Sequence, residues 1–137
     1  MVGAVIVTHG LLARELLDAA ERIVGRTEAI RAVSIDWDDD VADARQEIQA
    51  AINEVDAGAG VLIFTDMFGG TPTNVSLAFL AKDQVEIITG VNLPMIIKLT
   101  SVQNSDASLL DIAQELRERG QTSIYVASEI LSSRQEA

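Results

Sequence analysis

The stretch Ala-Val-Ile-Val-Thr-His-Gly, residues 4–10, decides the fold. Its β-branched apolar residues predict a short strand over residues 3–8, buried on both faces as strands of parallel sheets are. The strand leads into His9, the only histidine among the 137 residues. Taken alone, a histidine at a strand end is more often a turn or helix-capping residue than a reactive group. Its meaning depends on what stands at the ends of the neighbouring strands.

The rest of the chain alternates predicted strands with predicted helices. Further strands are expected at residues 31–36, 60–65, 85–89 and 122–127, and helices at residues 11–24, 41–55, 73–82, 95–102 and 108–119. Ser108 with Asp111 predicts a capping box for the last helix, and Gly120 its end. The alternation predicts an α/β fold with a doubly wound, mostly parallel open sheet between two layers of helices. We expect residues 1–128 to form one domain and residues 129–137 a polar tail.

Composition limits the classes of function. Hydrophobic residues make up 48% of the chain, which predicts a folded core, and the absence of cysteine excludes disulfides and thiolate chemistry. The formal net charge of -11 argues against nucleic acid as a partner, because polyanions are bound through clustered Lys and Arg. No run reaches the roughly 18 apolar residues of a membrane span, and the N-terminus lacks a secretory signal. The sequence therefore predicts a cytoplasmic protein without membrane insertion.

Polar segments follow three of the predicted strands, at residues 8–10, 66–74 and 90–94. Sheets of this kind place their sites at the carboxyl ends of the strands, near the point where the strand order reverses. The first and third strands are commonly neighbours there, so His9 and Asp66 are expected to meet. A carboxylate that accepts a hydrogen bond from one imidazole nitrogen aims the lone pair of the other nitrogen outward. The pair therefore predicts a nucleophilic histidine.

The segment Phe68-Gly-Gly-Thr-Pro-Thr-Asn74 indicates what that histidine would attack. Paired glycines allow close approach of the backbone, and a helix that begins near Pro72 offers unpaired N–H groups to an anion. Thr71 and Thr73 could add hydroxyl donors. A plain glycine turn before a helix explains these residues equally well when they are taken alone. Together with the histidine and the aspartate, the loop favours transfer of a phosphoryl group onto the imidazole itself.

Other chemistries fit the residues less well. A transition-metal site would need carboxylates for every ligand but one, and no metal or organic cofactor is expected. The glycine loop lacks the lysine of a Walker A motif, and no G-x-S-x-G elbow of a serine hydrolase occurs. An aspartate-phosphorylated receiver is disfavoured because the first strand lacks an acidic pair and the last strand lacks a lysine. A flavin carrier is disfavoured because no hydroxyl-rich loop follows the first strand.

Three motifs stand at strand ends in this order: Thr8-His9-Gly10, then Asp66-Met-Phe-Gly-Gly-Thr-Pro-Thr-Asn, then Gly90-Val-Asn-Leu-Pro-Met. Over nearly its whole length the chain thereby resembles the mannose-type IIA domain of the bacterial phosphoenolpyruvate-dependent sugar phosphotransferase system. The resemblance implies a flavodoxin-like fold and a phosphotransferase that acts as a phosphocarrier. The histidine would accept a phosphoryl group from the phosphocarrier HPr and pass it to a histidine of a IIB component. The IIB component in turn serves sugar uptake through a membrane permease.

The resemblance also implies roles for individual residues. His9 would carry the phosphoryl group, on Nε2, and Asp66 would orient the ring through Nδ1. The phosphoryl oxygens would be bound by Gly69, Gly70 and Thr71. Five further residues would form the rim of the site or contact a partner, namely Thr8, Gly10, Phe68, Asn92 and Pro94.

Partners and output follow from the same resemblance. Family members form homodimers that can exchange a C-terminal strand, and residues 122–127 are the candidate strand here. Some relatives continue into a fused IIB domain, so the IIB partner of this chain is expected to be a separate protein or to be missing.

The same phosphorylation could instead regulate partner binding without sugar transport. A dihydroxyacetone-kinase phosphotransfer subunit shares the fold and the histidine, but the glycine loop looks more like the sugar system. The sequence does not tell which sugar is served.

Overall fold

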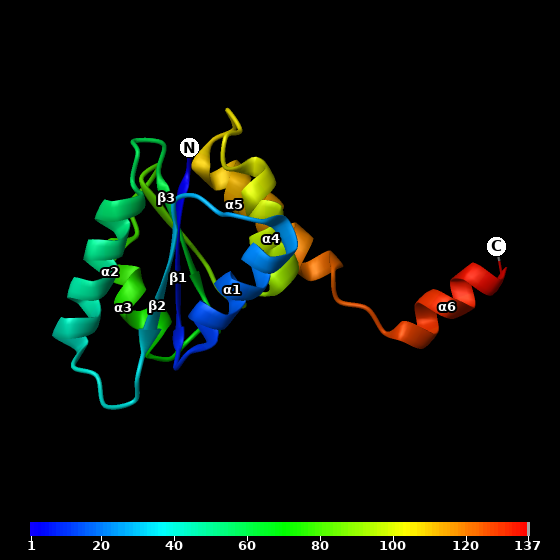
Figure 1. Cartoon of the computed structure of the whole chain (residues 1–137), viewed down its shortest axis with the longest axis horizontal. Coiled ribbons are helices and arrows are strands. Elements are labelled where there is room, and N and C mark those ends of the chain that lie inside the picture. The colour runs from blue at the N-terminus through cyan, green and yellow to red at the C-terminus, as the bar shows by residue number, and fades with distance from the viewer. Residues whose placement is uncertain (137) are drawn as a thin grey trace.

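The computed structural model describes residues 1–136 and, in the last helix, side chains as far as residue 132 (Figure 1). The strands are β1 (Gly3–His9), β2 (Ile30–Ile35), β3 (Val61–Thr65) and β4 (Val85–Ile88). The helices are α1 (Leu12–Val24), α2 (Val41–Val55), α3 (Thr71–Ser76), α4 (Leu93–Val102), α5 (Leu109–Thr122) and α6 (Ala127–Glu136), and a 3₁₀ turn, η1 (Leu77–Phe79), follows α3. Within these residues, no helix has both the length and the apolar content needed to cross a bilayer.

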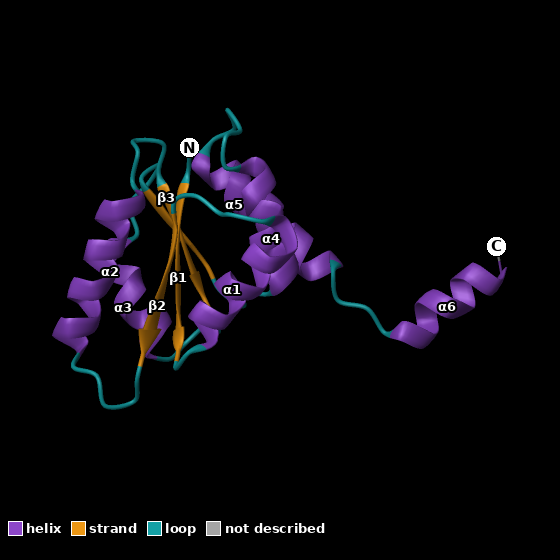
Figure 2. Ribbon diagram, viewed as in Figure 1, coloured by secondary structure: helices purple, strands orange, loops and turns teal. Residues whose placement is uncertain are grey.

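The strands form one parallel sheet in the order β2-β1-β3-β4. Figure 2 shows α1, α4 and α5 on one face of the sheet and α2 with α3 on the other. The predicted doubly wound open α/β sheet is therefore confirmed. The chain adds β2 on one side of β1 and β3 on the other, so the strand order reverses between β1 and β3. This reversal is where a doubly wound sheet places a site.

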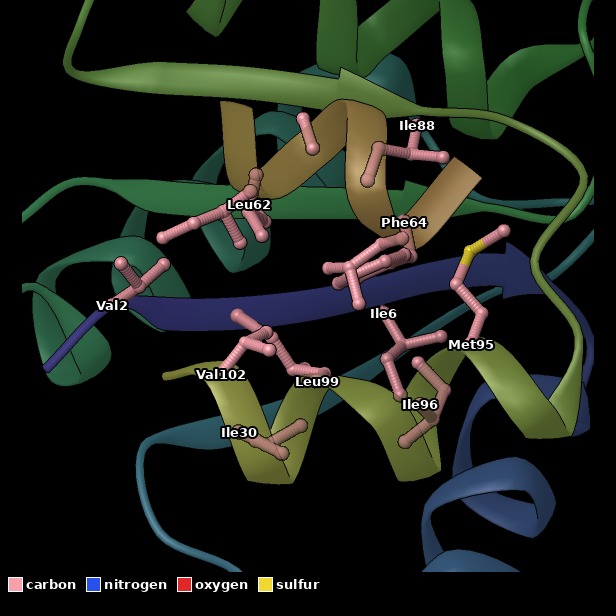
Figure 3. Packing of buried hydrophobic residues seen from close by; sticks show 14 of the residues in the cluster. Val2, Ile6, Ile30, Leu62, Phe64, Ile88, Met95, Ile96, Leu99 and Val102 are labelled. Atoms are coloured by element: carbon pink, nitrogen blue, oxygen red, sulfur yellow. The ribbon is translucent and has the colours of Figure 1, made fainter. Parts of the chain in front are cut away.

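Each face of the sheet has its own apolar core, and β1 contributes to both. Ile6 belongs to the cluster under α1, α4 and α5, whereas Val7 belongs to the cluster under α2. Figure 3 shows Ile6 directed from β1 toward Ile96 and Leu99 of α4. Four of these side chains are fully buried, namely Ile6, Val7, Ile96 and Leu99. Burial of each contributes about 1.5–3 kcal/mol to the free energy of folding. The carboxyl end of β1 is thus held by rigid packing on both sides.

Several helix ends differ from the sequence-based expectations. Helix α3 begins at Thr71, earlier than expected, and helical structure ends with η1 before Leu80. The hydroxyl of Ser108 accepts the backbone N–H of Asp111 at 3.1 Å, which confirms the predicted cap of α5. Gly120 does not end α5, because the helix continues to Thr122. A Cβ at Gly120 would lie 2.6 Å from Cε of Met95, so this glycine permits close packing of α5 on α4.

The predicted last strand, residues 122–127, is not formed. Helix α5 includes Thr122, and residues 123–126 link it to α6, which begins at Ala127. A strand needs a neighbour for its backbone hydrogen bonds, and in the single chain this segment pairs with none of the four strands. Figure 1 shows the link and α6 projecting away from the body of the protein. The expected polar tail is thus helical as far as Glu136, and residue 137 lies outside the described residues.

Candidate active site

His9 and Asp66 meet at the reversal point of the sheet. His9 is the last residue of β1, Asp66 directly follows β3, and these two strands are parallel neighbours. Oδ2 of Asp66 lies 2.7 Å from Nδ1 of His9 and also accepts the backbone N–H of His9 at 3.0 Å. The side chains are 22% and 13% exposed, respectively. The expectation that these two residues meet is therefore confirmed.

The charge of Asp66 decides which nitrogen of the ring carries the proton. Burial alone would raise the pKa of the Asp66 carboxyl, but the hydrogen bonds from the backbone and ring of His9, with the charge of the ring, outweigh it. The net effect lowers the pKa of Asp66 below its ordinary value, so the carboxyl is ionised at neutral pH and can only accept hydrogen bonds. Nδ1 must then be the donor. In the neutral ring, Nε2 keeps its lone pair.

Gly70 lies against the edge of the ring that carries this lone pair. A Cβ at Gly70 would stand 3.1 Å from Cε1 and 3.3 Å from Nε2 of His9, and the residue has φ +86° and ψ 166°. Only glycine adopts this backbone conformation without strain. In the described part of the chain, none of the backbone N–H groups of Gly69, Gly70 and Thr71 donates to another backbone group. The loop that reaches Nε2 through Gly70 thus carries backbone N–H groups that no other backbone group uses.

Buried hydroxyl groups fix the loop that carries Gly70. The hydroxyl of Thr73 donates to the carbonyl of Met67 at 2.6 Å, and therefore accepts from the hydroxyl of Thr65 at 2.7 Å. Both threonines are almost completely buried. The expectation that Thr73 offers its hydroxyl to a ligand is wrong, because its single proton is used by the loop. Thr73 instead ties the loop to the end of β3.

The residues expected at the rim fall into different places. Thr8 is fully buried, and its hydroxyl accepts the backbone N–H of Ala13 at 2.7 Å, so it supports α1 beneath the site instead of lining the rim. Gly10 has φ +54° and lets the chain turn away after His9. Phe68 is 79% exposed beside the glycine loop.

Asn92 and Pro94 belong to the start of α4, after β4 at the far side of β3. Oδ1 of Asn92 accepts the backbone N–H of Met95 at 3.1 Å, and its amide group donates to the carbonyl of Gly120 at 3.0 Å. Asn92 therefore caps α4 and joins it to α5. Among the described residues, neither side chain forms a hydrogen bond with His9, so their role at the rim stays a prediction.

Trp37 is part of the site and was missed by sequence reasoning. Its ring centroid lies 5.1 Å from that of His9, with an angle of 32° between the ring planes. Trp37 follows β2, which pairs with β1 on the side away from β3. The available signal is an aromatic residue just after a buried strand, but its closeness to His9 depends on β2 lying beside β1.

The arrangement suits attack by a nitrogen nucleophile on an anionic centre. An ionised carboxylate holds the proton on Nδ1, so Nε2 keeps its lone pair, and Gly70 of the glycine loop lies next to this nitrogen. Among the side chains that the structure describes, residues 1–132, no group of three or more His, Asp or Glu is placed to hold a metal ion.

The sheet order defines a flavodoxin-like α/β protein, and a histidine paired with an aspartate lies at the reversal point of its sheet. Comparison with known proteins gives the family. The chain belongs to the EIIA-man family, whose model, described as "PTS system fructose IIA component", matches residues 3–116. In general terms it is therefore a phosphotransferase component of the sugar phosphotransferase system.

Individual relatives agree with this assignment. The fructose-specific EIIA component of Bacillus subtilis is 30% identical, over 96% of this chain and 90% of that protein. The mannose-specific EIIAB component of Escherichia coli K12 is 27% identical over 90% of this chain, which spans only 38% of that longer protein. A solved PTS IIA protein associated with the fucose utilization operon of Streptococcus pneumoniae superposes with a TM-score of 0.82 at 29% identity, covering 95% of this chain and 96% of that one.

Proposed function

We propose that this protein is a phosphocarrier that accepts a phosphoryl group from phosphorylated HPr on Nε2 of His9 and passes it to a histidine of a IIB component. The observation that carries the proposal is the 2.7 Å contact between Nδ1 of His9 and the ionised Asp66. This contact fixes the proton on one nitrogen and leaves the other free to attack. In this proposal the protein works in the cytoplasm and is linked to a membrane permease only through its IIB partner.

In the proposed transfer, one bond to phosphorus forms and another breaks, and no proton is transferred. The lone pair of Nε2 forms a bond to phosphorus, and the bond from phosphorus to the donor's nitrogen breaks, with its electron pair returning to that nitrogen. The His9 ring keeps its Nδ1 proton and becomes cationic, which strengthens its attraction to Asp66. The backbone N–H groups of Gly69, Gly70 and Thr71 would bind the phosphoryl oxygens. The onward step to IIB is the same exchange in reverse.

The surroundings of His9 suit docking of protein partners. Met67 and Phe68 are 54% and 79% exposed and lie on the loop that reaches the ring. Apolar side chains exposed beside a reactive group are typical of contact surfaces for other proteins. The formal net charge of -11 would also favour a partner with a basic surface.

The function is tested by incubating the protein with phosphoenolpyruvate, the first enzyme of the system and HPr. The expected product is a protein heavier by one phosphoryl group, labile in acid and stable in base, with peptide mapping that places the group on His9. An absence of acid-labile phosphate contradicts the proposal. A second incubation with candidate IIB proteins then separates a relay, which loses the phosphoryl group, from a regulatory module, which keeps it.

Asp66→Asn is expected to slow phosphorylation at least about tenfold, a loss of about 1.4 kcal/mol of transition-state stabilisation, while the fold survives. Both N–H groups of His9 point at Oδ2, so an amide oxygen in that place still accepts them. The negative charge that stabilises the cationic ring is lost. Stopped-flow or quenched-flow rates with HPr, and circular dichroism as the folding control, check this. An unchanged rate would remove Asp66 from its proposed role.

We also propose that the protein forms a homodimer by exchanging the segment after α5. The outer edge of β4 is unpaired in the single chain, and Ile124, Tyr125 and Val126 are 75%, 69% and 59% exposed. A cavity of about 370 Å³, lined by apolar side chains of β4, η1 and α5, lies beside that edge. An exposed apolar segment can add a strand to such an edge.

Tyr125→Pro is therefore expected to convert a dimer into a monomer, because proline removes a backbone N–H from the added strand. Light scattering coupled to gel filtration measures the mass. Tyr125→Phe is the matched control and should stay dimeric. A monomeric wild type, or a dimeric Tyr125→Pro variant, would show that this segment does not join the subunits.

A further inference from the structure

We propose that Trp37 is a positioning residue that stabilises the cationic, phosphorylated ring of His9 through the face of its indole. This inference rests on the proposed function, because the ring gains its charge only when Nε2 is phosphorylated. The observation that carries it is the ring contact between Trp37 and His9, with centroids 5.1 Å apart and a 32° angle between the planes.

The contact with His9 buries little of the Trp37 side chain. The residue is 86% exposed, so its indole covers His9 while remaining largely in water. Hydrophobic burial therefore explains little of its position. The distance falls within the range in which aromatic rings attract each other, and within about 6 Å, where an aromatic face attracts a cation. Of the aromatic side chains, tryptophan attracts cations most strongly.

The turn that carries Trp37 is ordered by its own hydrogen bonds. The backbone N–H of Asp36 donates to Oδ2 of Asp39 at 2.8 Å, and the backbone N–H of Asp39 donates to the carbonyl of Asp36 at 3.1 Å. Asp40 then caps α2 by accepting the backbone N–H of Ala42. On the N-terminal side of Trp37, the backbone N–H of Gly10 donates to the carbonyl of Ile35, the last residue of β2. This bond joins the end of β2 to the end of β1, where His9 lies. Trp37 is thus held over the ring by the chain on both sides of it.

Each group around the imidazole has a separate contact. Asp66 binds Nδ1, the backbone of Gly70 lies next to Cε1 and Nε2, and the indole of Trp37 lies 5.1 Å from the ring in a tilted arrangement. When Nε2 attacks phosphorus, the donor bond breaks and the Nδ1 proton stays, so the positive charge spreads over the ring beneath the indole. Asp66 stabilises that charge from the edge of the ring. Trp37 would stabilise it from the face.

The lifetime of the phosphorylated ring reports this interaction without any partner protein. Loss of the phosphoryl group to water passes through a loose transition state in which the ring has largely given up its charge. An interaction that stabilises the charged ring therefore slows hydrolysis. A cation over an exposed aromatic face predicts a change of about two- to fivefold.

The test compares the wild type with Trp37→Phe and Trp37→Leu, each phosphorylated by phosphoramidate, a small donor that needs no docking surface. Trp37→Leu keeps an apolar cover without an aromatic face, and should hydrolyse about two- to fivefold faster than the wild type. Trp37→Phe keeps the face and should fall between the two. Ile23→Ala, on the exposed side of α1, is the control and should hydrolyse like the wild type.

Equal lifetimes in the wild type and Trp37→Leu would overturn the proposal, and so would a Trp37→Phe variant that hydrolyses as fast as Trp37→Leu. Slower transfer from HPr in Trp37→Leu with an unchanged lifetime would also overturn it, because Trp37 would then only contact the partner. A wild type that accepts phosphate from phosphoramidate but not from HPr contradicts the proposed function and leaves this inference testable.

A second measurement uses the fact that Trp37 is the only tryptophan of the chain. Its fluorescence should change when His9 is phosphorylated by phosphoramidate, and should not change in His9→Gln under the same treatment. An unchanged spectrum in the fully phosphorylated wild type would contradict the ring contact.

Discussion

His9→Gln is expected to take up no phosphoryl group at all, from HPr or from a small donor, while the protein remains folded. His9 is the only histidine, so no second imidazole can replace it. Glutamine has no lone pair of comparable nucleophilicity, because its amide nitrogen is conjugated with the carbonyl group. The measurement is the intact mass after incubation with phosphoenolpyruvate, the first enzyme and HPr, with the wild type in a parallel reaction.

The fold should survive this change because His9 lies at the end of β1, outside the two apolar cores. Its backbone N–H can still donate to Asp66, so the carboxylate keeps one of its partners. A thermal melt within a few degrees of the wild type is the control for folding. Acid-labile phosphate on His9→Gln would show that another residue is the acceptor and would exclude the proposed mechanism.

Gly70→Ala is expected to slow phosphoryl transfer about a hundredfold. A methyl group there would stand 3.1 Å from Cε1 and 3.3 Å from Nε2 of His9, in the space through which phosphorus must approach. A misplacement of about 1 Å at a reacting centre can cost about 10²-fold in rate. The ring or the loop must move to make room, and either movement spoils the alignment. Rates with HPr, measured in the pre-steady state, give the size of the loss.

Gly69→Ala is the matched control for this prediction. Gly69 also has a positive φ, +83°, so alanine strains the backbone there as well, but no atom lies within 4 Å of its Cβ position. The control variant should therefore lose much less activity than Gly70→Ala. Equal losses in both variants would mean that backbone strain alone, and not contact with the His9 ring, impairs transfer.

The predictable parts of the fold are the strands and helices whose apolar residues recur with a regular period in the sequence. Apolar runs placed β1 to β4, and helical spacing placed α1 and α2, because burial against the sheet follows directly from these patterns. Residues 122–127 have a strand-like composition, yet an edge strand forms only beside a neighbouring strand. The position of Gly120 predicts a helix end, whereas in the structure its missing side chain permits the contact with Met95. Neither fact is local in the sequence.

The candidate site was also predictable in part: the sequence indicates the pair of His9 and Asp66, but not the contacts of Thr73 and Trp37. The meeting of His9 and Asp66 follows from the usual neighbourhood of the first and third strands, which sequence order suggests. Thr73 could not be assigned correctly, because its hydroxyl bonds depend on the path of the loop back to β3. Trp37 was missed since its contact depends on the second strand lying on the other side of β1. The catalytic and binding roles of all these residues remain predictions.

The three contacts around the imidazole come from two loops, one after β2 and one after β3, that leave the same end of a rigid sheet. The conformational entropy of orienting the ring is therefore lost once, when the chain folds, and not again at each encounter. A carrier meets two partners in every cycle, one that gives and one that takes. A ring that needed reorientation would add its ordering cost to both encounters, whereas a ring fixed in advance keeps the forward and reverse barriers low together.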